Sequence, residues 1–152
     1  MPSRTTWKVT SIPVGDGPEG LDLSPDGREL WTAHFRDGDV SILDVAGKKV
    51  IGTIALRTRR SNRLKFTPDG RRVLVSELDS SELVVVDALA RKEIKRLALG
   101  SQPEGILIEP GGTRAYVAVA GDDVVALVDL RTLEVTGRIQ TGAGRDGMAW
   151  AP

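Results

Sequence analysis

The strongest constraint on the fold of this chain is one short phrase that occurs three times. It reads SPDGRELWTAHF over 24–35, TPDGRRVLVSEL over 67–78 and EPGGTRAYVAVA over 109–120. The prolines of these turns, together with the last residue, keep a spacing of 43, 42 and 42 residues: Pro25, Pro68, Pro110 and Pro152. Aspartates that follow an apolar run keep the same spacing: Asp44, Asp87 and Asp129. The chain is therefore built from an internal repeat.

Each period contains four short runs that are typical of β-strands, here called a, b, c and d. In the first period they cover 20–24, 28–34, 39–44 and 49–56. They are rich in valine, isoleucine and leucine and too short for ordinary helices. An antiparallel sandwich is an alternative all-β fold, but it does not require such a repeat. Four antiparallel strands in a unit of roughly 40–50 residues predict the blades of a β-propeller.

The repeat resembles the YVTN-type β-propeller repeat family, which is also WD40-like in its blades. That family's pattern runs P-x-G, an apolar strand, S-P-D-G, a strand near Y-V-T-N, then V-x-V-I-D and a strand ending in V-G. PEGLDLSPDG, VSILD and IPVG match it, whereas Y-V-T-N reads WTAH, LVSE and YVAV. The resemblance covers nearly the whole chain and implies a propeller, and it specifies function only weakly.

The repeat predicts a single partial propeller over 1–152. The expected parts are a strand d of a preceding blade over 6–19, three blades over 20–62, 63–104 and 105–146, and the start of a fourth blade over 147–152. Propellers typically close with about 4–8 blades, so three blades leave three alternatives. The chain belongs to a longer propeller, pairs with a second copy to close a ring, or stands as an open arc with exposed edges.

Composition limits the partners of the chain. Lysine plus arginine (21) balance aspartate plus glutamate (21), which argues against a general nucleic-acid binder. The absence of cysteine excludes disulfides and thiolate chemistry. No apolar run is long enough for a membrane-spanning helix, and the N-terminus lacks the features of a signal peptide. As written, the chain is expected to be cytoplasmic; a truncated N-terminus would allow a periplasmic or secreted protein.

Four residues occupy the x position of P-x-G, just before strand a. They are Glu19, Asn62, Glu104 and Asp146. Strand a lines the central channel in the family that the chain resembles, so these residues are expected at the channel mouth. Oxygen donors of this kind suit a divalent cation such as calcium, and some propeller lactonases hold calcium with Glu, Asn and Asp side chains. The alternative is that x is a solvated, variable loop position.

An arginine cluster and a lone histidine are expected on the same face, where the d–a and b–c loops meet. The cluster is Arg57, Arg59, Arg60 and Arg63. Arginine forks bind carboxylate or phosphate, so an anion patch is one interpretation. Charge exchange with Asp16, Glu77 and Asp79 is the other. His34 is the only histidine; it could act as a base or a haem ligand, as in the propellers of some haem nitrite reductases, or make a structural hydrogen bond.

No catalytic motif is present: the chain lacks G-x-S-x-G, a Walker loop and H-E-x-x-H. The favoured function is a binding or interaction module for a small ligand or a protein, using the face of the d–a and b–c loops. One alternative is a lactonase-like, metal-dependent hydrolase or a fragment of one. The other is a truncated propeller without independent activity.

Overall fold

A computed structural model of the chain describes residues 6–151, and it consists of three four-stranded antiparallel sheets. Each sheet is a meander in which neighbouring strands follow one another in sequence. Blade 1 contains β1 (Pro18–Leu23), β2 (Glu29–His34), β3 (Val40–Asp44) and β4 (Lys49–Ile54). Blade 2 contains β5 (Ser61–Phe66), β6 (Arg72–Glu77), β7 (Glu82–Asp87) and β8 (Lys92–Ala98). Blade 3 contains β9 (Pro103–Ile108), β10 (Arg114–Val119), β11 (Val124–Asp129) and β12 (Glu134–Gln140).

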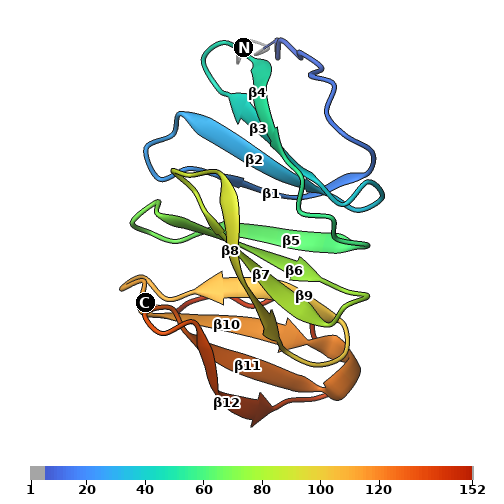
Figure 1. The fold of residues 1–152 in the computed structure, drawn as a ribbon, viewed down its shortest axis with the longest axis vertical. Coiled ribbons are helices and arrows are strands. Elements are labelled where there is room, and N and C mark those ends of the chain that lie inside the picture. Colours follow the sequence, from blue (N-terminus) through green and yellow to red (C-terminus); the bar gives the residue numbers. More distant parts are fainter. Residues whose placement is uncertain (1–5, 152) are drawn as a thin grey trace, which may run out of the picture.

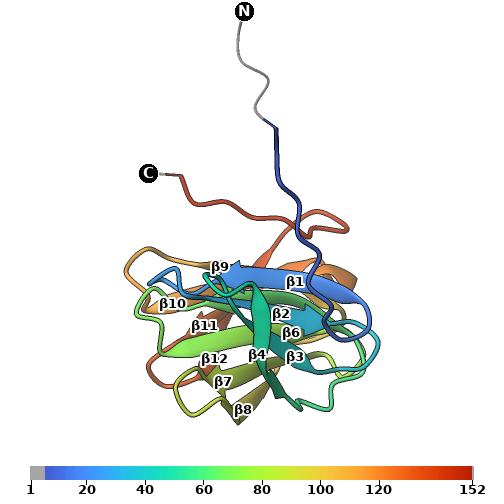
Figure 2. The ribbon, with the colours of Figure 1, turned by 90° about the horizontal axis from the view of Figure 1, so that it is seen from above.

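The predicted all-β propeller architecture is confirmed. The three sheets lie in sequence order from one end of the molecule to the other (Figure 1). In the view from above, β1 and β9 lie on one side of the stack and β8 and β12 on the other (Figure 2). One short 3₁₀ helix, η1 (Ala120–Asp122), joins β10 to β11. Within residues 6–151, no helix is long and apolar enough to cross a membrane.

Two apolar cores hold the stack together, one at each junction between blades. Between blades 1 and 2, Trp31 and Ile42 pack with Leu64 and Val73, and all four are buried. Between blades 2 and 3, residues of β6 and β7 pack with residues of β9, β10 and β11. Alternate side chains of a middle strand therefore serve opposite junctions, as the period of two in a β-strand requires.

The first strand of each blade begins two residues earlier than the sequence predicted. The expected starts were Gly20, Arg63 and Gly105, whereas the observed strands begin at Pro18, Ser61 and Pro103. The reason is a β-bulge inside each P-x-G segment, where the pairing register with the second strand shifts. A bulge lets a strand continue while it redirects a side chain. The P-x-G motif therefore belongs to the strand and not to the loop before it.

One aromatic contact recurs at two equivalent places in the repeat. Trp31 of β2 packs edge-on against Phe66 of β5, with 5.3 Å between ring centroids. Tyr116 of β10 lies two repeats after Trp31, and Trp150 lies two repeats after Phe66. These two rings also pack together, with centroids 6.5 Å apart. Trp150 therefore contacts blade 3 at the residue that the first strand of a following blade would contact.

Residues 6–17 and 141–151 flank the sheets without pairing into them. Both segments leave the stack on the side of β1 and β9 (Figure 2). A strand forms its hydrogen-bond ladder only with a neighbour, and the neighbours that the repeat assigns to these segments are not among residues 6–151. Of the flanking strands expected over 6–19 and 147–152, residues 6–17 and 147–151 form no strand. Residue 152 lies outside the described part.

Blade 1 exposes an apolar face whose equivalent in blade 2 is buried. Leu21 and Leu23 of β1 are 59% and 48% exposed. Their repeat equivalents in β5, Leu64 and Phe66, are 1% and 8% exposed because blade 1 covers them. Residues of one repeat position thus differ in burial only through the presence of a preceding blade. This exposed apolar surface marks a place where another blade would fit.

The repeat offers a matched pair of truncations that tests this stacking. We expect Leu64→Ala to lower the free energy of unfolding by about 2–5 kcal/mol, the range for truncation of a buried leucine. Leu21→Ala should cost less than about 0.5 kcal/mol, as for an exposed position. Urea denaturation of both variants measures the difference. Equal costs would show that the outer face of blade 1 is covered in solution.

Candidate functional site

The d–a and b–c loops meet on one face of the stack, as the strand order predicts. The N–H of Leu78, in the b–c loop of blade 2, donates to the carbonyl of Arg60 at 3.1 Å. In blade 3, Ala120 donates in the same way to Gln102 at 3.0 Å. These bonds fix the loops on which most of the predicted site residues lie. The candidate site is therefore a rigid rim and not a set of independent loops.

The P-x-G bulges bring neighbouring blades into close backbone contact at this rim. A Cβ at Gly20 would collide with the carbonyl oxygen of Asn62, and one at Gly105 with that of Asp146. Glycine is needed there because the next blade approaches its Cα. In blade 2 the same position holds Arg63. Blade 2 therefore has a long cationic side chain at a repeat position where blades 1 and 3 have glycine.

Arg63 draws the predicted channel-mouth carboxylates together. Its guanidinium lies 2.8 Å from Asp146 and 3.5 Å from Glu19, although these residues come from opposite ends of the stack. Asn62 is 7% exposed, and its Oδ1 has no hydrogen-bond partner among the described residues. Glu19 and Asp146 thus lie together at Arg63, an arginine that the sequence assigned to the anion patch.

Glu104 is the carboxylate of the rim that Arg63 does not bond. Its pKa is raised by partial burial and by the negative charge of Asp146, with a smaller contribution from Glu19. Arg63 opposes this shift without overcoming it. Three carboxylates face one guanidinium at this mouth, so the rim carries an excess of negative charge.

The rim does not have the geometry of a metal site in the described part of the chain. Among residues 6–151, no three or more His, Cys, Asp or Glu side chains are arranged so that they could hold a metal ion. Arg63 lies between Glu19 and Asp146, where its guanidinium supplies the positive charge. The divalent-cation hypothesis for Glu19, Asn62, Glu104 and Asp146 therefore gains no support from the donor geometry.

The predicted anion patch is divided among several interactions. Arg60 forms an ion pair with Asp79 at 3.2 Å and stacks over the Phe35 ring at 4.8 Å. Arg63 belongs to the rim, and Arg57 and Arg59 are exposed. The charge exchange that the sequence suggested is therefore present for Arg60. For Arg63 the exchange is with different carboxylates.

Glu77 organises this loop face through backbone hydrogen bonds. Its carboxylate is fully buried and accepts N–H bonds from Arg60 at 2.6 Å, from Arg59 at 3.2 Å and from Ser80. Burial alone would raise the pKa of Glu77, but bonds from Ser80, Arg60 and Asp79 outweigh it and lower the pKa. Glu77 thus accepts bonds from main-chain N–H groups, whereas the sequence predicted charge exchange with arginine side chains.

His34 lies at the end of β2 and is 1% exposed. Its Nδ1 is 2.8 Å from the Asp37 carboxylate, which also accepts the Asp16 N–H at 2.7 Å. The Nε2 atom is buried and has no partner among the described residues. Gly15 packs so closely on the ring that a Cβ there would collide with it. His34 thus joins two loops of blade 1 and is enclosed by them.

Comparison with known proteins shows similarity in sequence and in structure. A family profile described as Cytochrome D1 heme domain matches residues 1–109. Among solved structures, the chain is similar to a chain of Kuenenia stuttgartiensis hydrazine synthase, with a TM-score of 0.80 and 32% sequence identity. That match covers 92% of this chain and 39% of the hydrazine synthase chain. The YVTN-type resemblance is compatible with both matches. Comparison with curated proteins found no match.

The raised pKa of Glu104 makes a prediction for stability against pH. A carboxyl whose pKa is higher in the folded than in the unfolded state opposes folding while it is charged. The penalty is present above the folded pKa and vanishes below the ordinary value of 4.5. Glu104→Gln should therefore raise Tm at about pH 7 and leave it unchanged at about pH 4. Thermal unfolding at both pH values measures this, and a lower Tm at neutral pH would contradict it.

Proposed function

The chain belongs to the cytochrome D1 heme domain family, and on this premise we propose that it is the binding section of a larger propeller. The binding surface is the rim of Glu19, Asn62, Arg63, Glu104 and Asp146. The observation that carries the proposal is that Glu19 and Asp146, from opposite ends of the stack, both bond the Arg63 guanidinium, beside which Glu104 also lies. Loop faces on rigid scaffolds are where binding functions commonly lie.

Haem, which the family name implies, does not fit the side chains of this section. His34 is the chain's only histidine, and its Nδ1 bond to Asp37 resembles the second bond of many metal-binding histidines. However, the ring is enclosed beneath Gly15, and neither described cavity borders it. A macrocycle has no room beside its Nε2. We therefore derive no role for His34 in binding haem.

The proposal of a larger propeller rests on both ends of the stack. This chain spans 39% of the length of the hydrazine synthase chain that it resembles. Trp150 packs on Tyr116 as the first strand of a following blade would, and Leu21 and Leu23 expose the face that a preceding blade would cover. Further blades of the same repeat would bury these surfaces. The alternative is ring closure by a second copy of the chain. A measurement of mass in solution distinguishes the two, because ring closure would give a dimer.

The ligand that best suits the rim is an organic cation. Two negative charges remain after Arg63 is counted against Glu19, Glu104 and Asp146. A further positive charge would stabilise the charged form of Glu104, which burial and the charges of Asp146 and Glu19 disfavour. A protonated amine or a guanidinium, on a small molecule or a protein side chain, can bond to separate carboxylates without the compact ligand shell that calcium needs.

Titration of the purified chain with putrescine tests this function. We expect putrescine to raise Tm in wild type and to have no effect on Glu104→Gln, because the neutral amide removes the charge that the ammonium would neutralise. Glu134→Gln is the matched control. Glu134 is exposed at the start of β12, the fourth strand of its blade, whereas the rim residues lie at the first strands.

The same titration with calcium chloride distinguishes the lactonase-like alternative. A rise in Tm with calcium but not with putrescine, lost in Glu104→Gln, would favour a divalent-cation site over the organic cation. An equal response to putrescine in wild type and Glu104→Gln would contradict binding at this rim.

A further inference from the structure

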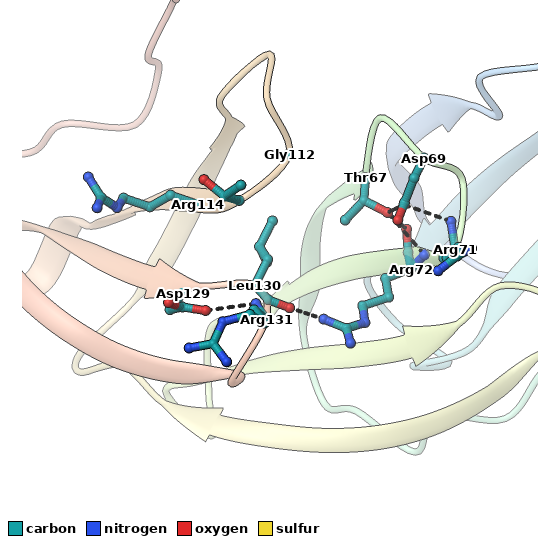
Figure 3. Close-up of a pocket in the computed structure, with 10 residues that line it drawn as sticks. Thr67, Asp69, Arg71, Arg72, Gly112, Arg114, Asp129, Leu130 and Arg131 are labelled. Carbon is teal, nitrogen blue, oxygen red and sulfur yellow. Dashed lines mark hydrogen bonds between the residues drawn. The ribbon is translucent and has the colours of Figure 1, made fainter.

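A second feature lies on the opposite face of the stack, where the a–b and c–d turns meet. A cavity of about 440 Å³ is open there between blades 2 and 3. Four arginines line it: Arg71, Arg72, Arg114 and Arg131. In Figure 3, Arg72 reaches from blade 2 to the carbonyl oxygen of Leu130 in blade 3, Arg131 lies next to that carbonyl, and Arg114 extends away from Arg72.

This cavity carries more positive than negative charge, because four arginines and two carboxylates, Asp69 and Asp129, line it. Within residues 6–151, none of the four arginines forms an ion pair. The two carboxylates of the cavity are engaged in their own turns. Asp69 accepts from the Thr67 hydroxyl and the Arg71 N–H, and Asp129 accepts from the Arg131 and Thr132 N–H groups. These bonds lower the pKa of both carboxyls, with smaller contributions from the charges of Arg71 and Arg72 at Asp69 and of Arg131 at Asp129.

The repeat supplies an internal comparison, because an equivalent cavity of about 440 Å³ lies between blades 1 and 2. There the position of Arg72 holds Glu29, and the position of Arg131 holds Leu89. Glu29 forms an ion pair with Arg91 at 2.7 Å and accepts from the Trp31 indole N–H at 2.8 Å. The same architecture is therefore acidic and internally paired at one junction, and basic and unpaired at the next.

We propose that the cavity between blades 2 and 3 binds the phosphate group of a small molecule through Arg71, Arg72 and Arg131. Guanidinium groups donate in pairs to phosphate oxygens, and such charge-assisted bonds are stronger than neutral ones. Arg72 is half-buried and already oriented by Leu130, which leaves its other N–H groups free to donate. The site is independent of the rim on the other face.

The size of the cavity favours a phosphate ester over free phosphate. Its volume of about 440 Å³ lies within the range of small-molecule sites, which is roughly 300–1,000 Å³. Thr113 and Gly112 also line this cavity, so the rest of an ester would have residues to contact besides the arginines. We therefore expect a phosphomonoester to bind more tightly than inorganic phosphate.

Isothermal titration of the full chain with inorganic phosphate and with glycerol phosphate tests the site. Arg131→Leu introduces the residue of the equivalent cavity at an exposed position, so the variant is expected to fold. It should weaken binding of both probes by about tenfold, as expected for one charge-assisted contact. Arg72→Gln should weaken binding at least as much.

Arg28→Gln is the matched control, because Arg28 occupies the position of Arg71 in the acidic cavity. It should leave binding of both probes unchanged. No detectable binding at millimolar concentration, or equal affinities of Arg131→Leu and wild type, would overturn the proposal. Equal binding of the two probes would overturn the preference for an ester and leave a free-phosphate site.

Discussion

The structure depends on the packing of the first strand of one blade against the second strand of the blade before it. Phe66 on Trp31 is the clearest instance, and Leu64 is buried in the same junction. Through this contact neighbouring blades cover each other's faces, so a terminal blade has one face without a partner. The exposure of Leu21 and the position of Trp150 on Tyr116 both follow from that rule.

The sequence predicted this architecture because the same turn residues and apolar runs recur in every blade. Pro25 and its equivalents, together with the apolar runs between them, are sufficient to identify four strands per blade. The bulge at P-x-G was not predictable, because a shift of register depends on how the next blade approaches Gly20 and Gly105. A contact between neighbouring blades leaves no periodic signal of its own in the sequence.

The sequence offered candidate site residues but not the contacts between them. Equal spacing predicted that Glu19, Glu104 and Asp146 share one mouth, whereas the contact of Arg63 with Glu19 and Asp146 required knowing that its side chain spans the stack. Glu77 was expected to bond side chains and instead orders main-chain N–H groups. The basic cavity was visible in the sequence, because the repeat position of Glu29 holds Arg72 and Arg114 in the later repeats. One geometry thus carries different charges at successive junctions.

The account is tested most directly by a double-mutant cycle on Tyr116 and Trp150. The two single substitutions to alanine and the double substitution are compared by urea denaturation. If residues 147–151 take the place of a blade's first strand, the coupling free energy should be about 0.5–1.5 kcal/mol, the range for aromatic pairs. A coupling of zero would show that the C-terminal segment is not held on blade 3, and would contradict the account of the chain as one section of a continuing propeller.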